Sequence, residues 1–225
     1  MKNLIVREDM EKCRDFCRAI IGKEDQYNRM NEHNDLRMFR TDVGKIGELD
    51  IQKLGYFLNT GNIEGFKYSD DMFKIFEGQT NADKADFFID DKSVDVKTIY
   101  ASDHRNIVIP VDQPIKDIYI CSKIITKNTW YSKDFNQYKD ANWGKNIGLM
   151  IRDITDYNCE GFILKSDVLK QPIKNFGNEA YFVSTNILNK NIEEIEKLLK
   201  NISPVESISP IQNIKEKNTN IIRPQ

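Results

Sequence analysis

The sequence predicts an α/β protein built on a mixed central β-sheet that is flanked by helices. Two observations predict this class. Apolar residues recur at helical spacing in three stretches, and short apolar or alternating runs separated by polar breaks occupy the middle of the chain. Helices and strands in such an order pack around a shared core. Hydrophobic residues make up 40% of the 225 residues, which is enough for such a core.

Two helices are predicted in the N-terminal part. The first spans residues 3–22, where apolar residues recur at roughly helical spacing. Residues 23–41 are polar and are predicted to form a loop with one helical turn near its end. The second helix is expected to start at Thr41 or Asp42, either of which can cap it, and to end at Gly61.

Strands dominate the middle of the chain. Residues 85–89 are apolar and rich in Phe, residues 94–99 alternate between apolar and polar, and residues 90–93 form a polar break. Together they predict a β-hairpin with a short turn. Residues 106–111 and 117–125 predict two further strands.

The C-terminal half has fewer regular segments. Residues 161–164 and 180–184 are predicted to be short strands, and residues 189–200 form an amphipathic helix. Residues 203–225 hold three of the six prolines and little periodicity, which is typical of a flexible tail. We therefore expect a single domain over residues 1–202.

The charge balance limits the kinds of function. Lys and Arg number 33 against 35 Asp and Glu, giving a net charge of -2 and a pI near 5.8. This excludes a uniformly basic coat but not a local basic cleft. The chain has no apolar run of about 18 residues, and the apolar piece 4–6 is too short for a signal peptide. We expect no membrane partner and a cytoplasmic location.

The cysteines are few and scattered, which is typical of reduced thiols rather than of a disulfide framework (Cys13, Cys17, Cys121, Cys159). Cys13 and Cys17 lie four apart and could begin a metal site. The two histidines, His33 and His104, do not stand at the spacing of a zinc finger, so the pattern disfavours structural zinc.

The hairpin carries the candidate chemistry. Side chains two apart in a strand share a face, so Val94 and Val96 point one way and Asp95 and Lys97 the other. Antiparallel pairing can bring Asp86 close to Asp95. Two carboxylates that meet repel each other unless a divalent cation lies between them, and Mg²⁺ prefers oxygen ligands. Such a metal polarises a phosphodiester and lowers the pKa of bound water, while a nearby lysine stabilises developing charge.

The order of Asp86 and Asp95-Val96-Lys97 resembles the PD-(D/E)XK nuclease superfamily of phages and bacteria. Ala85 stands where the motif's name has Pro, and Asp95 where Glu is more frequent; the superfamily tolerates both variations. Gly44-Lys45-Ile46-Gly47-Glu48 is similar to the setting in which many members carry an acidic residue on a helix. Residues 161–167 resemble a late strand and its exit in several members.

The resemblance implies a restriction-endonuclease-like core over about residues 42–185, preceded by a helical part, 1–41. It implies a metal-dependent endonuclease that hydrolyses DNA phosphodiester bonds. Double-strand cleavage would need two sites, which points to a homodimer.

The resemblance also implies roles for individual residues. Glu48, Asp86 and Asp95 would bind Mg²⁺ or Mn²⁺, directly or through water. The backbone carbonyl of Val96 would add a ligand. Lys97 would orient or activate the attacking water and stabilise developing charge.

Each of these residues also has an ordinary structural interpretation. Asp95 and Lys97 can form a solvated strand face, and Glu48 can lie on the exposed side of an amphipathic helix. Asp90 and Asp91 compete for the role of first acid, although they suit the turn better.

Other segments offer further candidates. Residues 78–81 could present polar groups to a base or phosphate, or be simply a loop. His104 could approach the scissile phosphate, or be an ordinary surface histidine. Aromatic residues interleaved with lysines in residues 128–143 could stack on bases or pack in the core, and residues 146–153 alternate like a strand.

Two alternatives to a DNA nuclease stay open. The first is a non-catalytic module on the same fold that binds nucleic acid or protein, for example a phage anti-defence or regulatory protein. The second is a nuclease that cleaves RNA with the same site.

Overall fold

The computed structural model of the chain describes residues 4–20, 34–69, 72–75, 85–127, 154–175 and 177–202. Several expectations fall outside these ranges, namely most of the polar loop before the second helix, the loop at 78–81, the aromatic segment and ambiguous strand within 128–153, and the tail at 203–225. Within the described ranges, no helix is both long and apolar enough to cross a membrane.

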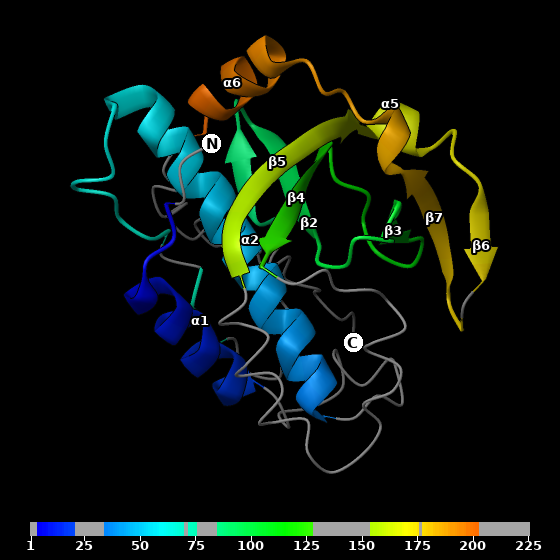
Figure 1. Ribbon diagram of the computed structural model, residues 1–225. Coiled ribbons are helices and arrows are strands. Elements are labelled where there is room, and N and C mark those ends of the chain that lie inside the picture. The colour runs from blue at the N-terminus through cyan, green and yellow to red at the C-terminus, as the bar shows by residue number, and fades with distance from the viewer. Residues whose placement is uncertain are drawn as a thin grey trace, which may run out of the picture.

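The elements confirm the α/β class. They run in the order α1 (Arg7–Ile20), α2 (Asn34–Thr60), β1 (Phe87–Ile89), β2 (Lys92–Ile99), β3 (Asn106–Pro110), β4 (Ile118–Thr126), β5 (Ile154–Leu164), α5 (Lys165–Val168), β6 (Ile173–Asn175), β7 (Glu179–Ser184), the 3-10 helix η3 (Thr185–Ile187) and α6 (Ile192–Lys200) (Figure 1). The principal sheet has the order β1-β2-β4-β5 and is mixed, because β2 and β4 run parallel and the other pairs antiparallel.

The strands divide between two sheets, whereas one mixed central sheet was expected. The second sheet has the order β3-β7-β6 and is antiparallel. Strand β3 follows β2 in the chain, but it pairs with β7 across the register Asn106↔Ser184. An alternating apolar pattern predicts a strand without fixing its partner, so the sequence could not separate the two sheets.

Helix α2 begins at Asn34, which is seven residues before Thr41 and eight before Asp42, the two predicted starts. Phe39 is fully buried, and Val43 and Ile46 follow it at spacings of four and three, so the apolar face continues N-terminally of Thr41. Asp42 is therefore a buried residue inside the helix, 2% exposed, and not its cap. The predicted end is confirmed: the helix stops at Thr60, and Gly61 adopts a φ of 78°.

Two strands also differ from their predicted bounds. Strand β5 begins at Ile154 rather than at Gly161. The sequence did not reveal its first part, because the buried residues there, Tyr157 and Cys159, stand between polar residues that hide the alternation. Strand β6 was not predicted. It has three residues, all of them exposed, so burial imposes no pattern on its sequence.

Each face of the principal sheet has its own cover. On one face, Val94 and Val96 of β2 pack in a cluster with residues of α2 and α6 such as Ile51 and Leu199. On the other face, a second cluster joins Ile99 of β2 to residues of β3 and β7. The sheet therefore lies between a helical layer and the three-stranded sheet, and Asp95 and Lys97 lie on the side of the latter.

The end of α6 is bound to the β1–β2 hairpin. Ile202, just after the helix, forms a β-bridge with Ile89 at the end of β1. The Asn201 side-chain amide donates to Asp90 Oδ2 at 3.1 Å in the hairpin turn. The last described residues of the chain thereby hold the hairpin in place.

A buried ion pair joins α1 to α2. Lys53 Nζ lies 2.5 Å from Asp9 Oδ2, and the two side chains are 5% and 0% exposed. Asp9 also accepts hydrogen bonds from the Val6 N–H at 2.7 Å and from the Tyr68 hydroxyl at 2.8 Å. The carboxylate of Asp9 is thus fully engaged, as a buried charge requires.

Candidate active site

The β1–β2 hairpin brings Asp86 beside Asp95. Its turn consists of Asp90 and Asp91, with φ values of 45° and 63°, as in a two-residue turn that matches the twist of the strands. The pairing Phe87↔Val94 sets Asp86, one residue earlier, across from Asp95. Asp90 and Asp91, the two competitors for the role of first acid, therefore form the turn, and the acid that meets Asp95 is Asp86.

Asp86 is fixed by two hydrogen bonds to the neighbours of Asp95. Its backbone N–H donates to the carbonyl of Val94 at 2.8 Å. Its carboxylate oxygen Oδ2 accepts from the Val96 N–H at 2.6 Å. The residues on both sides of Asp95 therefore hold Asp86, and its carboxylate cannot turn away without losing the bond to the Val96 N–H.

Asp95 and Lys97 form an ion pair on the sheet face opposite the two valines. Lys97 Nζ lies 2.7 Å from Asp95 Oδ2, with side chains 28% and 18% exposed. The contact is an ion pair, and Asp95 Oδ2 accepts no hydrogen bond of good geometry within the described residues. Burial acts to lower the pKa of Lys97, but the attraction of Asp95, aided by Asp86, outweighs it and raises that pKa. Lys97 therefore carries its charge throughout the neutral pH range.

Helix α2 delivers Glu48 to the site through a close contact with β2. A Cβ added to Gly47 would lie 2.0 Å from Thr98 Oγ1, so only glycine allows the helix and the strand to approach this closely. Gly44, the other glycine of the motif, has no atom within 4 Å of such a Cβ. The second glycine, next to Glu48, is thus the one that sets the distance between helix and strand.

Glu48 forms a nearly buried ion pair with Lys45. Lys45 Nζ lies 2.6 Å from Glu48 Oε2, and the side chains are 8% and 15% exposed. The sequence interpretation assigned no role to Lys45, although it stands three residues before Glu48, at a spacing that brings two helical side chains together. Lys45 is the charged residue of this site that sequence reasoning missed.

The acids act on one another electrostatically. Burial raises the pKa of Asp86 well above its ordinary value, and the negative charges of Glu48 and Asp95 raise it further. Lys45 and the N–H of Val96 act in the opposite sense and are outweighed. Glu48 from α2 and Asp95 from β2 therefore both act on Asp86, which lies just before β1.

The donor set has the chemistry of a site for a hard cation, with carboxylate oxygens under mutual repulsion. As the side chains stand, no group of three His, Cys, Asp or Glu residues within the described ranges is gathered closely enough to hold a metal ion. Two ammonium groups, those of Lys45 and Lys97, lie against the acids instead. The carboxylate oxygens are of the type that a hard cation prefers as ligands. An ion bound here would have to share these oxygens with the two lysines.

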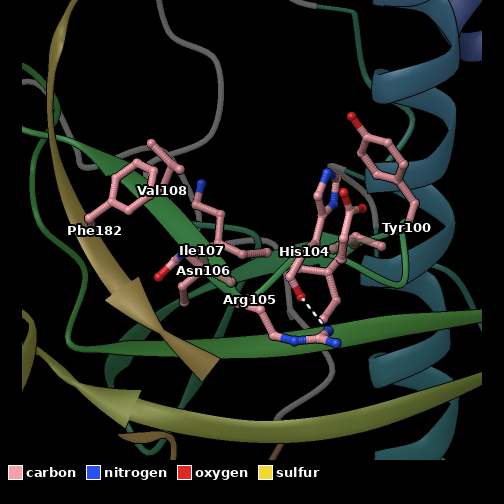
Figure 2. A pocket seen from close by; sticks show the side chains of 11 residues that line it. Tyr100, His104, Arg105, Asn106, Ile107, Val108 and Phe182 are labelled. Carbon is pink, nitrogen blue, oxygen red and sulfur yellow. Dashed lines mark hydrogen bonds between the residues drawn. The ribbon is translucent and has the colours of Figure 1, made fainter. Parts of the chain in front are cut away.

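Beyond the acids, a pocket of about 420 Å³ opens beside Lys97 (Figure 2). His104 lies in its wall, half-buried, with its ring 4.7 Å from that of Tyr100. The sequence offered His104, with Asp103 and Arg105 beside it, as a residue that could approach the scissile phosphate, and all three line this pocket. The other wall comes from β3 and β7. Because only the pairing of these two strands brings them beside Lys97, the pocket could not be found from the sequence.

Comparison of the chain with protein-family models, with curated proteins and with solved structures finds no match.

Proposed function

We propose that this chain is a metal-dependent nuclease that hydrolyses phosphodiester bonds in DNA. The position of Asp86 carries the proposal. Because it is bonded to Val94 and to Val96, its carboxylate is held beside that of Asp95. Paired carboxylates next to an ammonium group suit phosphodiester hydrolysis, in which negative charge builds up on the phosphate.

Asp86, Asp95 and Glu48, with the backbone carbonyl of Val96, are the groups that would hold Mg²⁺ or Mn²⁺. When bound, such an ion polarises the phosphodiester and lowers the pKa of its water. Burial, and after it the repulsion from Glu48 and Asp95, raises the pKa of Asp86. The repulsive part supports this assignment, because a divalent cation relieves it. Lys45 offsets part of the same repulsion from the helix side.

Lys97 acts in this proposal as a fixed cation rather than as a base. Its raised pKa keeps the ammonium protonated at neutral pH, so it cannot accept a proton from water. It can donate hydrogen bonds to a phosphate oxygen and to the attacking water, and so orient both. Asp95 positions it, since the two side chains form an ion pair at 2.7 Å.

The test is a cleavage panel with matched variants. Plasmid, linear and single-stranded DNA, and RNA, are incubated with the full chain in Mg²⁺, Mn²⁺ or EDTA. We expect cleavage of DNA that EDTA abolishes. Asp95→Asn should remove it, while Asp91→Asn, an exposed carboxylate of the same hairpin, should not. Likewise Lys97→Met should remove it, and Lys92→Met, an exposed lysine of the same strand, should not. Full activity of Asp95→Asn or Lys97→Met would disprove the assignment.

A binding module without turnover is the second candidate, and one observation favours it. Lys45 and Lys97 already pair with acids of the site, and the described residues contain no ready group of three metal ligands. The same panel separates the two, because a binding module retards DNA or RNA in a gel and leaves it intact in every metal. Cleavage of RNA alone would identify the third alternative, a ribonuclease.

If the enzyme cuts both strands of a duplex, we propose that it does so as a homodimer, with one site for each strand. Light scattering of the free protein and of its DNA complex would measure the mass. A monomer in both samples that still cuts both strands at one position would contradict this part of the proposal.

A further inference from the structure

The pocket beside Lys97 joins the candidate active site to the second sheet. It extends from Lys97, two residues before the end of β2, past the loop after that strand, to β3 and β7. Its volume of about 420 Å³ lies in the range of sites that hold one small molecule or one monomer of a polymer. Whatever fills it therefore lies next to the ammonium group that the proposed reaction uses.

One wall of the pocket is apolar and aromatic. Val108 and Phe182 face each other directly across the β3–β7 pairing, and Val108 is 44% exposed. Figure 2 shows these two side chains together on one side. Lys174 Nζ lies 4.7 Å from the centre of the Phe182 ring, so this ring already takes part in a cation–π contact. Phe182 is half-buried and lines the pocket, and an aromatic ring that borders a pocket is a surface on which a nucleobase can stack.

The opposite wall offers hydrogen-bonding groups. Figure 2 shows His104 and Tyr100 across the pocket from Phe182. Burial, aided by Arg40, lowers the pKa of His104 against the opposing pull of Asp103, so its ring is neutral at pH 7. A neutral imidazole carries one donor and one acceptor, which suits the edge of a base.

Arg105 supplies positive charge at the pocket. It donates through Nη1 to the backbone carbonyls of Ser102 and, at 3.3 Å, of His104. These bonds direct the guanidinium along the loop, and its other N–H groups are of the kind that meets a phosphate. Lys97 and Arg105 thus give the pocket two cationic groups for the backbone of a nucleic acid.

We propose that this pocket binds one unpaired nucleotide next to the phosphate that Lys97 faces. The inference rests on the proposed nuclease function and names its substrate class: single strands, or duplexes with an unpaired nucleotide at the cut. A base that stays paired is stacked between its neighbours and must leave the stack to enter such a pocket. Nucleotides in single strands and bulges are already unpaired, so most of the energy needed to free the base is not required of them.

Binding by the full chain carrying Asp95→Asn tests the pocket without cleavage. The probes are oligodeoxynucleotides with one 2-aminopurine, whose fluorescence falls when it stacks: a single strand, a perfect duplex, and a duplex in which the 2-aminopurine is unpaired. All are titrated in Mg²⁺. We expect the single strand and the bulged duplex to bind about tenfold more tightly than the perfect duplex, with quenching.

Variants of Phe182 identify the stacking ring. Phe182→Leu keeps an apolar side chain but no ring, and should weaken binding of the single strand by about tenfold. Phe182→Tyr keeps the ring and should bind as before. Ile173→Ala, an exposed residue of the same sheet outside the pocket, should change nothing. Equal affinity for the perfect duplex, or no effect of Phe182→Leu, would overturn the proposal.

The two proposals fail differently. If the probes bind as expected but the unmutated chain cleaves nothing in Mg²⁺ or Mn²⁺, the nuclease function is wrong and the pocket is a binding site for unpaired nucleotides. If the chain cleaves perfect duplexes as fast as single strands, and Phe182→Leu slows neither, the nuclease function stands and the assignment of the pocket falls.

Discussion

Replacing Gly47 with alanine tests how the site is assembled. The added Cβ would lie 2.0 Å from Thr98 Oγ1 and 3.1 Å from Thr98 Cβ. Thr98 is short and β-branched, so it has little freedom to withdraw, and α2 or β2 must move. Alanine is better than glycine inside a helix by about 1 kcal/mol, whereas overpacking costs about 1–3 kcal/mol. Because this contact is so short, we take the upper figure and expect a net loss of about 2 kcal/mol.

Gly44→Ala is the matched control, since it makes the same substitution one helical turn earlier, where no atom lies within 4 Å. It should gain up to about 1 kcal/mol. Thermal unfolding followed by circular dichroism would then show a melting temperature about 4–8 °C lower for Gly47→Ala and about 2–4 °C higher for Gly44→Ala. The proposed DNA cleavage should fall in Gly47→Ala alone, because Glu48 moves with the helix.

The double variant Gly47→Ala/Thr98→Ala decides whether the contact is the cause. Removing Thr98 Oγ1 leaves the Thr98 Cβ, 3.1 Å away, as the nearest of the contacting atoms, a contact that small shifts can relieve. The double variant should therefore recover most of the loss, as coupled neighbours do. If Gly47→Ala proved as stable as Gly44→Ala, or if Thr98→Ala did not help it, the close approach of α2 and β2 would be wrong.

Three further predictions concern stability and reactivity. Lys53→Met should cost about 3–5 kcal/mol in urea unfolding, because it leaves Asp9 charged and buried, and a loss below about 1 kcal/mol would contradict the buried ion pair. Burial raises the pKa of Asp50 to about 7, so the folded protein keeps a proton that the unfolded chain releases near pH 4. The free energy of unfolding should therefore fall from about pH 4 to about pH 7, more steeply than in Asp50→Asn; parallel curves would refute this. All four cysteines are buried, and burial raises the pKa of Cys121 to about 12, so a disulfide reagent should label the native protein only as fast as it unfolds.

Local patterns predicted the hairpin and its two faces well. Val94 and Val96 alternate with Asp95 and Lys97, and burial on one side follows from that period. The turn was also readable, since Asp is among the residues that tolerate positive φ. These features depend on residues close in sequence, which is why the sequence sufficed.

The misplaced start of α2 has a local cause. Asp42 has the chemistry of a helix cap, and the polar residues before it favour a loop. Burial of Phe39 against the core decided otherwise, and the helix carries Asp42 inside it with a pKa raised to about 7 by burial. Tertiary packing overrode a capping preference that is worth only about 1 kcal/mol.

The second sheet and the pocket could not be predicted for a different reason. They require β3 to pair with β7, so that Val108 meets Phe182 from far along the chain. Nothing in an alternating strand names its partner. The ion pair of Lys45 with Glu48 is local, and the spacing of three could have revealed it, but only the packing of α2 on β2 places it at the acids.

The attachment of Ile202 to Ile89 has a consequence for protein synthesis. A ribosome makes the hairpin early, but the residues that bind its turn and its edge strand come more than a hundred residues later. Domains fold as their segments become available, and a strand with an unpaired edge is exposed until then. We therefore expect that a nascent chain shorter than 202 residues has no finished carboxylate pair. Under the function proposed above, a chain still on the ribosome would therefore not yet cut DNA.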